Sequence, residues 1–392
     1  MLRARLSEMT GTQARLIAFY LPQFHPILEN DEWWGKGFTE WTNVAKAKPL
    51  FPGHYQPHIP ADLGFYDLRV PETRLAQAEM AQKYGIEGFC YWHYWFAGKR
   101  LLDRPFAEVL KSGEPDFPFC LAWANQTWTG IWHGAPGRVL IEQTYPGESD
   151  YVSHFHSILE AFRDERYLTV DGRKAFIVYV PRRIPDPRLF TDLWRELARK
   201  NGLGGVYFMA VCEPGWDPRM HGFDAAIVNS SIRGREDQGK VSLRVKGLLN
   251  KDLRERLGVT AIHRCANSAR QAMSAAMRGR RRIPSIFDYA GFVSRAFPER
   301  HYRDWEYPMV VPNWDNTPRS GLNGIVLHRS SPELFKSHLR NALGLVEDRT
   351  YDRRIVFIKS WNEWAEGNHL EPDFKYGHGY LEALRNELSG QG

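Results

Sequence analysis

Short apolar runs alternate along the chain with longer stretches in which apolar residues recur at helical spacing. This alternation predicts β-strands followed by amphipathic α-helices, as in parallel α/β proteins. The expected strands are residues 16–21, 86–91, 117–124, 175–179, 205–211, 224–228, 309–312 and 355–360. The expected helices are residues 71–84, 104–111, 151–163, 188–201, 332–343 and 379–388.

Eight strands are the number that closes a (β/α)8 TIM barrel, so we expect one α/β catalytic domain over residues 1–392. A doubly wound open sheet is the alternative, but no GxGxxG motif follows the first strand. Residues 29–67 are too long for an ordinary connection and are expected to form a wall of a cleft. Residues 230–306 form a second insertion with a helix-like run at 266–277, which we interpret as a helical excursion or lid.

Polar and aromatic residues gather after most of the expected strands, where a TIM barrel builds its active site. This position, with the 29–67 insertion, predicts the following substrate-binding residues: Tyr20, Gln23, Glu40, Trp41, Trp92, His93, Trp95, Trp123, Asn125, Gln126, Trp128, Trp314, Asp315, Asn362 and Trp364. Some of the tryptophans could belong to the core instead. Asp315 could either bind sugar hydroxyls or cap the next turn.

The aromatic content changes this picture, because the chain has 14 Trp, 17 Tyr and 22 Phe. Trp and Tyr suit ligands that are apolar on one face and polar on the other. Sugars are such ligands, since their C–H faces stack on rings while their hydroxyls need hydrogen bonds. A Trp-rich core is the alternative explanation.

Two carboxylates, Glu363 and Glu366, follow the last expected strand and stand beside Trp361 and Trp364. Glycosidic bond cleavage uses two carboxyl groups, one as acid and one as base or nucleophile. Mutual repulsion and an apolar setting would raise the pKa of one of them, which suits it to act as the acid. We therefore predict Glu363 and Glu366 as the catalytic pair, the alternative being two solvated glutamates.

Five segments of the sequence resemble the WbsX-type family, which is grouped with glycoside hydrolase family 99. They are WNEWAEGNHLEPD at 361–373, FYLPQFHP at 19–26, GFTEWTN at 37–43, GFCYWHYW at 88–95 and PMVVPNWDNTP at 308–318. The resemblance covers most of residues 15–382, with the basic insertion as its least matched part.

The resemblance implies a (β/α)8 barrel and a retaining, endo-acting enzyme. It assigns Glu363 as the base that deprotonates the sugar's 2-hydroxyl, which forms a 1,2-anhydro intermediate. It assigns Glu366 as the acid/base for the leaving group and then for water. Ala365 stands where family 99 commonly has His, and Gln23 and His25 stand where that family tends to have aromatic residues. The mannose specificity of family 99 is therefore not carried over.

The net charge of +6 conceals a strongly basic segment. Residues 232–282 hold 14 Lys and Arg against four acids, a surplus that exceeds the charge of the whole chain. Such a segment can contact an anionic glycan, a phosphate or a membrane surface, or it can be a solvated helical face. We expect no specific nucleic-acid partner.

The remaining composition predicts few other features. Cys90, Cys120, Cys212 and Cys265 are scattered without CxxC pairing, so buried, reduced thiols are expected. No HExxH, HxH or DxD spacing occurs, so we expect no metal and no other cofactor. The N-terminus lacks the apolar core of a signal peptide, and no apolar stretch is long enough to span a membrane, which favours a cytoplasmic protein.

Three functions remain open at this point. The first is a retaining glycoside hydrolase or transglycosylase that acts on an oligo- or polysaccharide. The second is a glycosyltransferase of O-antigen, lipopolysaccharide or other cell-surface polysaccharide biosynthesis, because WbsX-type proteins commonly carry that description. The third is a non-catalytic glycan-binding barrel, against which the presence of both glutamates argues.

Overall fold

The barrel strands of the computed structural model form where apolar residues run consecutively, because a parallel strand covered on both faces is buried throughout. The structure describes residues 14–130, 135–213, 215–230, 232, 283–297 and 302–390. The barrel strands are β1 (Arg15–Tyr20), β2 (Gly88–Phe96), β4 (Phe119–Trp123), β8 (Arg173–Val178), β9 (Val206–Cys212), β10 (Ala225–Val228), β12 (Glu306–Val310) and β14 (Ile355–Ile358).

Strand β1 closes the barrel, because it pairs in parallel with both β14 and β2. Ala18 lies opposite Ile358 on one side and opposite Phe89 on the other. The other neighbouring pairs of these eight strands are also parallel. The predicted (β/α)8 barrel is confirmed, since an open sheet would leave its edge strands paired on one side only.

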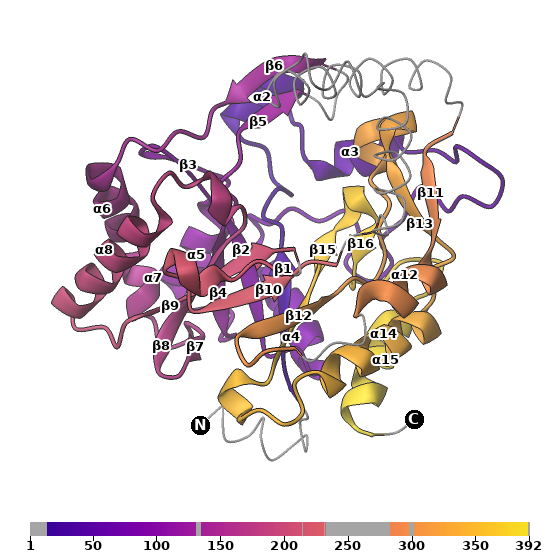
Figure 1. The fold of residues 1–392 in the computed structure, drawn as a ribbon. Coiled ribbons are helices and arrows are strands. Elements are labelled where there is room, and N and C mark those ends of the chain that lie inside the picture. Colours follow the sequence, from indigo (N-terminus) through magenta and orange to yellow (C-terminus); the bar gives the residue numbers. More distant parts are fainter. Residues whose placement is uncertain are drawn as a thin grey trace, which may run out of the picture.

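Helices cover the outside of the barrel, with α6 and α8 on one side and α14 and α15 on the other (Figure 1). Those that match the expected helices are α4 (Pro71–Lys83), α5 (Arg104–Ser112), α6 (Glu148–Ser157), α7 (Leu159–Arg163), α8 (Pro187–Lys200), α14 (Pro332–Gly344) and α15 (Gly379–Leu388). The single helix expected at 151–163 is two helices, because the backbone leaves the helical conformation at Ile158.

Helix α8 shows how the sequence positions this outer layer. Asp186 caps its first turn by accepting a hydrogen bond from the backbone N–H of Leu189. Phe190, Trp194 and Ala198 are spaced by four residues and are buried on one face. The Trp194 ring lies 4.7 Å from the Phe176 ring of β8 and 6.1 Å from the Phe208 ring of β9, so this face packs onto the barrel.

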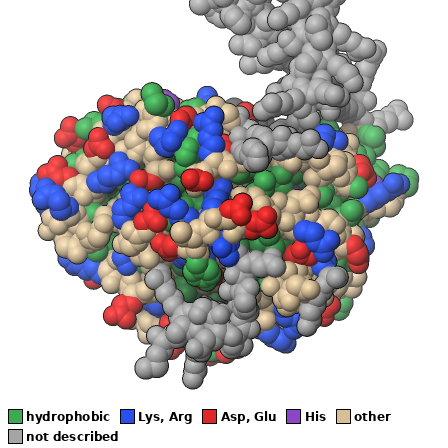
Figure 2. Space-filling view, turned by 60° about the horizontal axis from the view of Figure 1, so that its bottom comes forward, with side chains coloured by type: hydrophobic (Ala, Val, Ile, Leu, Met, Phe, Trp, Pro, Cys, Tyr) green, Lys and Arg blue, Asp and Glu red, His purple; other side chains and the backbone are tan. Residues whose placement is uncertain are grey.

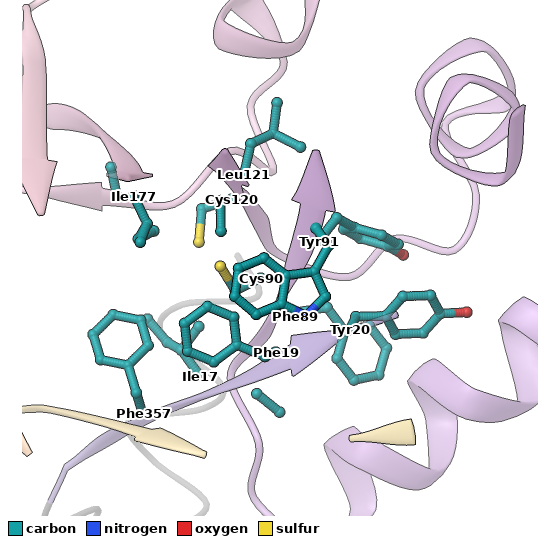
Figure 3. Close-up of a cluster of buried hydrophobic side chains, with 14 of the residues drawn as sticks. Ile17, Phe19, Tyr20, Phe89, Cys90, Tyr91, Cys120, Leu121, Ile177 and Phe357 are labelled. Carbon is teal, nitrogen blue, oxygen red and sulfur yellow. The ribbon is translucent and has the colours of Figure 1, made fainter. Parts of the chain in front are cut away.

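The core is built from aromatic and aliphatic side chains of neighbouring strands (Figure 3). Phe19 stacks on Trp92 at 4.7 Å and contacts Phe357 at 5.8 Å. Cys90 and Cys120 lie opposite each other on β2 and β4, and both are free thiols. Cys212 is also buried and free, which confirms the expectation of reduced thiols for these three cysteines. Cys265 lies outside the described residues.

The connections after the strands carry the shorter elements. The strands are β3 (Lys99–Leu101), β5 (Trp128–Gly130), β6 (Ala135–Ile141), β7 (Thr169–Val170), β11 (Ser285–Asp288), β13 (Ile325–His328), β15 (Asn362–Glu363) and β16 (Asn368–His369). The helices are α2 (Leu28–Trp34), α3 (Glu40–Lys46), α12 (Tyr289–Ala296) and α13 (Thr317–Ser320). The 3-10 segments are η2 (Pro181–Arg183), η3 (Pro218–His221), η4 (Gly321–Asn323), η5 (Tyr351–Arg353) and η6 (Trp364–Glu366).

Both predicted insertions lie beside the barrel. The 29–67 insertion contributes part of α2 and all of α3, which lie with β5 and β6 above the barrel in Figure 1. The described end of the 230–306 insertion forms β11 and α12, and β11 pairs in parallel with β13. The helix-like run at 266–277 and nearly all of the basic segment lie outside the described residues.

The described surface carries mixed charge. Figure 2 shows Lys and Arg side chains interspersed with Asp and Glu side chains on the face turned toward the viewer. Ion pairs join Arg353 to Asp171 and Arg173 to Asp224. Among the helices that the structure describes, none combines the length and the apolar character needed to cross a membrane.

Candidate active site

A cavity of about 440 Å³ lies at the carboxyl ends of the barrel strands, where the 29–67 insertion covers them. This is the end of a TIM barrel at which active sites form. The predicted site residues that line the cavity are Gln23, Glu40, Trp92, Gln126, Trp128, Trp314, Glu363 and Glu366. The structure thus brings both predicted catalytic glutamates into one aromatic cavity.

The loop after β14 delivers the two glutamates. Strand β15 ends at Glu363, and η6 carries the chain through Glu366 before β16 pairs back with β15 in antiparallel fashion. Gly367 makes this turn with a φ of 58°, a conformation that favours glycine. A Cβ atom there would lie 3.0 Å from the Cβ of Asp315 and 3.2 Å from its backbone nitrogen. The turn therefore requires glycine both for its conformation and for space.

Arg319 of α13 connects three carboxylates in this cavity. Its Nη1 lies 2.6 Å from Oε1 of Glu366 and 3.6 Å from Oε1 of Glu363. Its Nη2 lies 3.0 Å from Oε2 of Glu40. Burial alone would lower the pKa of Arg319, but Glu40, Glu366 and Glu363 outweigh it and raise that pKa, so the guanidinium stays charged. The sequence patterns did not single out Arg319, because its role depends on contacts between distant segments.

Glu366 has the electrostatics of a proton donor. Burial and the nearby charge of Glu363 raise the pKa of Glu366 to about 7, although Arg319 and Lys359 act in the opposite direction. A carboxyl group with this pKa holds its proton in an appreciable fraction of molecules near neutral pH. Glu363 is oriented by the Ser360 hydroxyl, which donates to its Oε2 at 3.2 Å.

Lys359 is a second buried cation that lines the cavity. Its Nζ lies 4.6 Å from the centre of the Trp314 ring and 5.8 Å from that of Tyr179, which favours a cation–π arrangement. Burial alone would lower the pKa of Lys359, but Tyr179, Glu366 and Glu363 outweigh it and raise that pKa. The cavity therefore balances its carboxylates with Arg319 and Lys359. Lys359 is the last residue but one of the expected strand 355–360, but its position alone gave no signal of this role.

Aromatic rings form much of the remaining wall. Trp128 and Trp314 are half-buried and line the cavity, so part of each ring is available to a ligand. Trp34, from the insertion, lines the same cavity. Trp92 is buried and has one face stacked on Phe19, so it lies at the floor. Trp128 and Trp314 are the better stacking surfaces.

Three polar side chains line the cavity with atoms that have no hydrogen-bond partner among the described residues. The atoms without a partner are Oδ1 and Nδ2 of Asn30, Oδ1 of Asn43 and Nε1 of Trp314. A buried polar group without a partner is destabilising, so the wall of the cavity contains polar atoms whose hydrogen bonds the described residues do not satisfy. Asn43 lies in the GFTEWTN segment, whereas no sequence pattern pointed to Asn30.

Four predicted binding residues lie outside the cavity because of strand alternation. On β2, Trp92 and Tyr94 line the cavity, so His93 and Trp95 between and after them face the helical layer. His93 Nε2 lies 2.8 Å from Nε2 of a histidine in α6, on which the Trp95 ring also stacks. Trp123 donates its indole N–H to the backbone of β2, and Tyr20 donates its hydroxyl to a glutamine of α4. These four residues were predicted to bind substrate, but they belong to the packed core.

Three further predicted residues hold loops in place instead of lining the cavity. Trp41 donates its indole N–H to the Tyr66 carbonyl at 2.7 Å. The Asn125 amide bonds both the N–H and the C=O of Val180, at 2.8 and 2.9 Å. Asp315 is buried and accepts from the Thr317 N–H and hydroxyl. Of the two alternatives for Asp315, the structure supports the turn cap.

Asn362 and Trp364 anchor the loop that carries Glu363 and Glu366, from outside the cavity. Asn362 Oδ1 accepts from the backbone N–H of Leu21 at 2.7 Å, which ties the loop to the end of β1. Trp364, between the two glutamates, donates its indole N–H to Glu371 at 2.6 Å. Burial raises the pKa of Glu371 to about 7, although hydrogen bonds such as that from Trp364 lower it. These two predicted binding residues are therefore positioning residues.

The fold and the site together define a (β/α)8 barrel with a pair of carboxylates, Glu363 and Glu366, in a cavity at the carboxyl ends of its strands. The chain belongs to the family described as Glycosyltransferase WbsX, which it matches over residues 16–384. It is 40% identical over 382 residues to "Uncharacterized protein WxcX" of Xanthomonas campestris pv. campestris strain B100. That match covers 96% of this chain and 50% of the relative, so the chain spans about half the length of the curated relatives it matches.

Solved structures share the fold at low sequence identity. A glycoside hydrolase-like protein matches with a TM-score of 0.56 and 14% identity, over 96% of this chain and 94% of the other. A GH99 endo-alpha-mannosidase from Bacteroides thetaiotaomicron matches with a TM-score of 0.54 and 13% identity, over 96% of this chain and 97% of the other. The resemblance to family 99 is thus confirmed at the level of the fold.

Proposed function

We propose that this protein cleaves or transfers glycosidic bonds of an oligo- or polysaccharide with retention of anomeric configuration. One observation carries the proposal: Glu363 and Glu366 share a single guanidinium nitrogen of Arg319 inside an aromatic cavity at the catalytic end of the barrel.

The spacing of the two carboxylates supports retention over inversion. Their Oε1 atoms lie 2.6 and 3.6 Å from the same Arg319 nitrogen, so these two oxygens cannot be farther apart than those two distances combined. In inverting glycosidases the carboxyl groups stand about 6.5–9.5 Å apart, which leaves room for a water molecule between base and sugar. The two Oε1 atoms here are held closer together than that range, which leaves less room for such a water molecule.

The pKa of Glu366 supports its role as the general acid. In the first step, Glu366 gives its proton to the oxygen of the leaving group as the bond from that oxygen to the anomeric carbon breaks. As the family resemblance implies, Glu363 takes the proton of the sugar's 2-hydroxyl, and the 2-oxygen bonds the anomeric carbon to form a 1,2-anhydro sugar.

The second step reverses the proton movements. Glu366 removes a proton from water or from an acceptor hydroxyl, which attacks the anomeric carbon and opens the anhydro ring. Glu363 returns its proton to the 2-oxygen. Two inversions at one carbon give net retention, and both carboxyl groups end in their starting states.

The cavity wall supports a carbohydrate substrate. Trp128 and Trp314 offer ring faces for sugar C–H groups. The side chains of Asn30 and Asn43 add amide groups to this wall. The identity of the sugar and the linkage is left open, because Gln23 and Ala365 differ from the family 99 pattern.

A second candidate is glycosyl transfer in polysaccharide biosynthesis, because the matching family is described as a glycosyltransferase. The same carboxylates would then serve an acceptor hydroxyl in place of water. In this reaction the donor is either a glycan or an activated sugar such as a nucleotide-sugar.

The two candidates are separated by incubating the protein with bacterial surface polysaccharides, with and without nucleotide-sugars, and following products by NMR. We expect glycan-dependent product without nucleotide-sugar, whose first-formed anomer has the configuration of the substrate. First-formed product of opposite configuration would refute the retaining mechanism. Product only in the presence of nucleotide-sugar would establish the second candidate instead.

A further inference from the structure

Three buried side chains from separate segments converge just outside the active-site cavity. His58 comes from the 29–67 insertion, His369 from β16, and Asp373 from the segment that follows it. Nδ1 of His58 lies 2.9 Å from Nε2 of His369, and each of these nitrogens lies 4.0 Å from Oδ2 of Asp373. Among the described residues, this trio has its ligand atoms close enough to share one metal ion.

The hydrogen bonds behind the trio leave its ligand atoms directed at one another. His369 Nδ1 lies 2.9 Å from the carbonyl oxygen of Glu371, which can only accept, so Nδ1 carries the proton. The lone pair of His369 Nε2 therefore accepts a hydrogen bond from His58 Nδ1, and a metal ion would displace that proton. Asp373 Oδ1 accepts from the backbone N–H groups of Lys375 and Tyr376, which turns Oδ2 toward the histidines. Metal-binding histidines and carboxylates are typically held by partners of this kind.

The donor types also suit a metal. Two imidazoles and one carboxylate offer two nitrogens and one oxygen to a divalent ion, a donor set that zinc commonly takes in proteins.

The separations fit a small tetrahedral ion after slight movement. Around zinc, bonds of about 2.0–2.1 Å at tetrahedral angles place ligand atoms roughly 3.3 Å apart. The observed separations of 2.9, 4.0 and 4.0 Å bracket this value. His58 also lines a separate cavity of about 220 Å³, which has room for a water molecule as fourth ligand.

We propose that His58, His369 and Asp373 form a site for a divalent transition-metal ion of the zinc class. The ion joins the 29–67 insertion to the catalytic loop. His369 stacks on Trp364 with ring centres 3.7 Å apart, and Trp364 stands between Glu363 and Glu366 in the chain. The ion thus stabilises the loop that holds the glutamates without entering their cavity.

The sequence did not indicate the trio, because His58 comes from a distant segment and only His369 and Asp373 are close in sequence. His58 is 311 residues from His369, so no local motif announces the site. The expectation of a metal-free protein rested on short spacings alone. The proposal does not depend on the proposed function, since metal binding is measured without substrate.

The test uses full-length protein without a histidine tag, stripped of metal by a chelator and then dialysed. Binding of Zn²⁺ is measured by competition titration, coordination by the visible absorption of Co²⁺, and stability by the melting temperature. The variants are His58→Gln and Asp373→Asn. The matched control is His328→Gln, because His328 lines the same 220 Å³ cavity but is not one of the three ligands.

We expect stoichiometric Zn²⁺ binding, tetrahedral Co²⁺ bands and a metal-dependent rise in melting temperature for the wild type and the control. His58→Gln and Asp373→Asn should bind Zn²⁺ weaker by more than the roughly 10- to 100-fold cost of losing an outer partner. If the wild type shows neither Co²⁺ bands nor a Zn²⁺-dependent rise, the trio is a neutral hydrogen-bonded cluster and the proposal is wrong. Equal Zn²⁺ affinity in the wild type and in folded variants also overturns it. If a variant does not fold, the Co²⁺ spectrum of the wild type alone decides whether the site exists.

Discussion

At the scale of single residues, position in the sequence predicted the two glutamates in the cavity but not the cations that surround them and alter the pKa of Glu366. Glu363 and Glu366 were found because two carboxylates after a buried strand reach the catalytic end of a barrel. Arg319 and Lys359 were missed, because their importance arises from contacts made only in the folded chain. His93 was predicted as a ligand contact and is buried, because alternation along β2 turns it away from the cavity.

The raised pKa of Glu366 predicts the pH dependence of activity. Because the acid must be protonated in the first step, kcat/KM should fall as pH rises through about 7, the pKa of Glu366. A pH–rate profile of the wild-type enzyme on a natural glycan measures this. Activity that keeps rising well above that pH would show that Glu366 is not the acid.

Replacing Arg319 should shift the pH at which kcat/KM falls, in a direction that the structure predicts. Arg319 lowers the pKa of Glu366, so Arg319→Met should raise that pKa further and shift the fall of kcat/KM to higher pH. The matched control is Arg183→Met, since Arg183 lines the same cavity without a described ion pair to the glutamates. If kcat/KM of Arg319→Met falls at the same pH as that of the wild type, the assigned effect of Arg319 on the pKa of Glu366 is wrong.

At the scale of elements, the barrel strands were predictable because most of them are runs of consecutive buried residues, and β8 is buried after its first two residues. The exceptions have local causes, such as the backbone break at Ile158 that divides the expected helix at 151–163. The short elements β15, η6 and β16 could not be predicted, because they depend on the turn at Gly367 and on Asn362 bonding to Leu21. These elements place Glu363 and Glu366, the predicted catalytic pair, in the cavity.

The turn at Gly367 gives an element-scale test. Gly367→Ala adds a left-handed strain of roughly 1 kcal/mol and forces Asp315 away from the loop. Gly377→Ala is the matched control, because Gly377 has a similar φ of 52° with no atom within 4 Å of an added Cβ. We expect both variants to lower the melting temperature, and Gly367→Ala alone to lower kcat strongly. Equal kcat in the two variants would mean that the contact with Asp315 does not position the glutamates.

At the scale of the whole molecule, eight apolar runs separated by helical stretches were enough to predict the closed barrel. The cavity was only partly predictable, since its unpaired polar wall includes Asn30, which no pattern marks. The basic segment at 232–282 carries the charge asymmetry of the chain, but nearly all of it lies outside the described residues. Its contact with an anionic glycan or a membrane surface therefore stays a prediction.

Salt dependence tests that prediction. Replacing Arg280, Arg281 and Arg282 with Ser should weaken binding to an anionic polymer and leave turnover of a short neutral oligosaccharide nearly unchanged. The attraction should also weaken as ionic strength rises above ~0.1 M, where the Debye length is ~10 Å. Equal effects on both substrates would make the segment a structural part of the cleft, and no effect would make it a solvated surface.

The central claim is that Glu363 and Glu366 perform the chemistry, and turnover of Glu363→Gln and Glu366→Gln tests it most directly. Each substitution keeps the side-chain volume and removes the proton-transfer group, so circular dichroism and glycan binding should match the wild type. We predict that kcat on a natural glycan falls by at least ~10²-fold in each variant. Near wild-type turnover in either variant would contradict the assignment of that residue. If the wild type and both variants bind glycan equally well and none of them turns it over, the protein is a non-catalytic barrel.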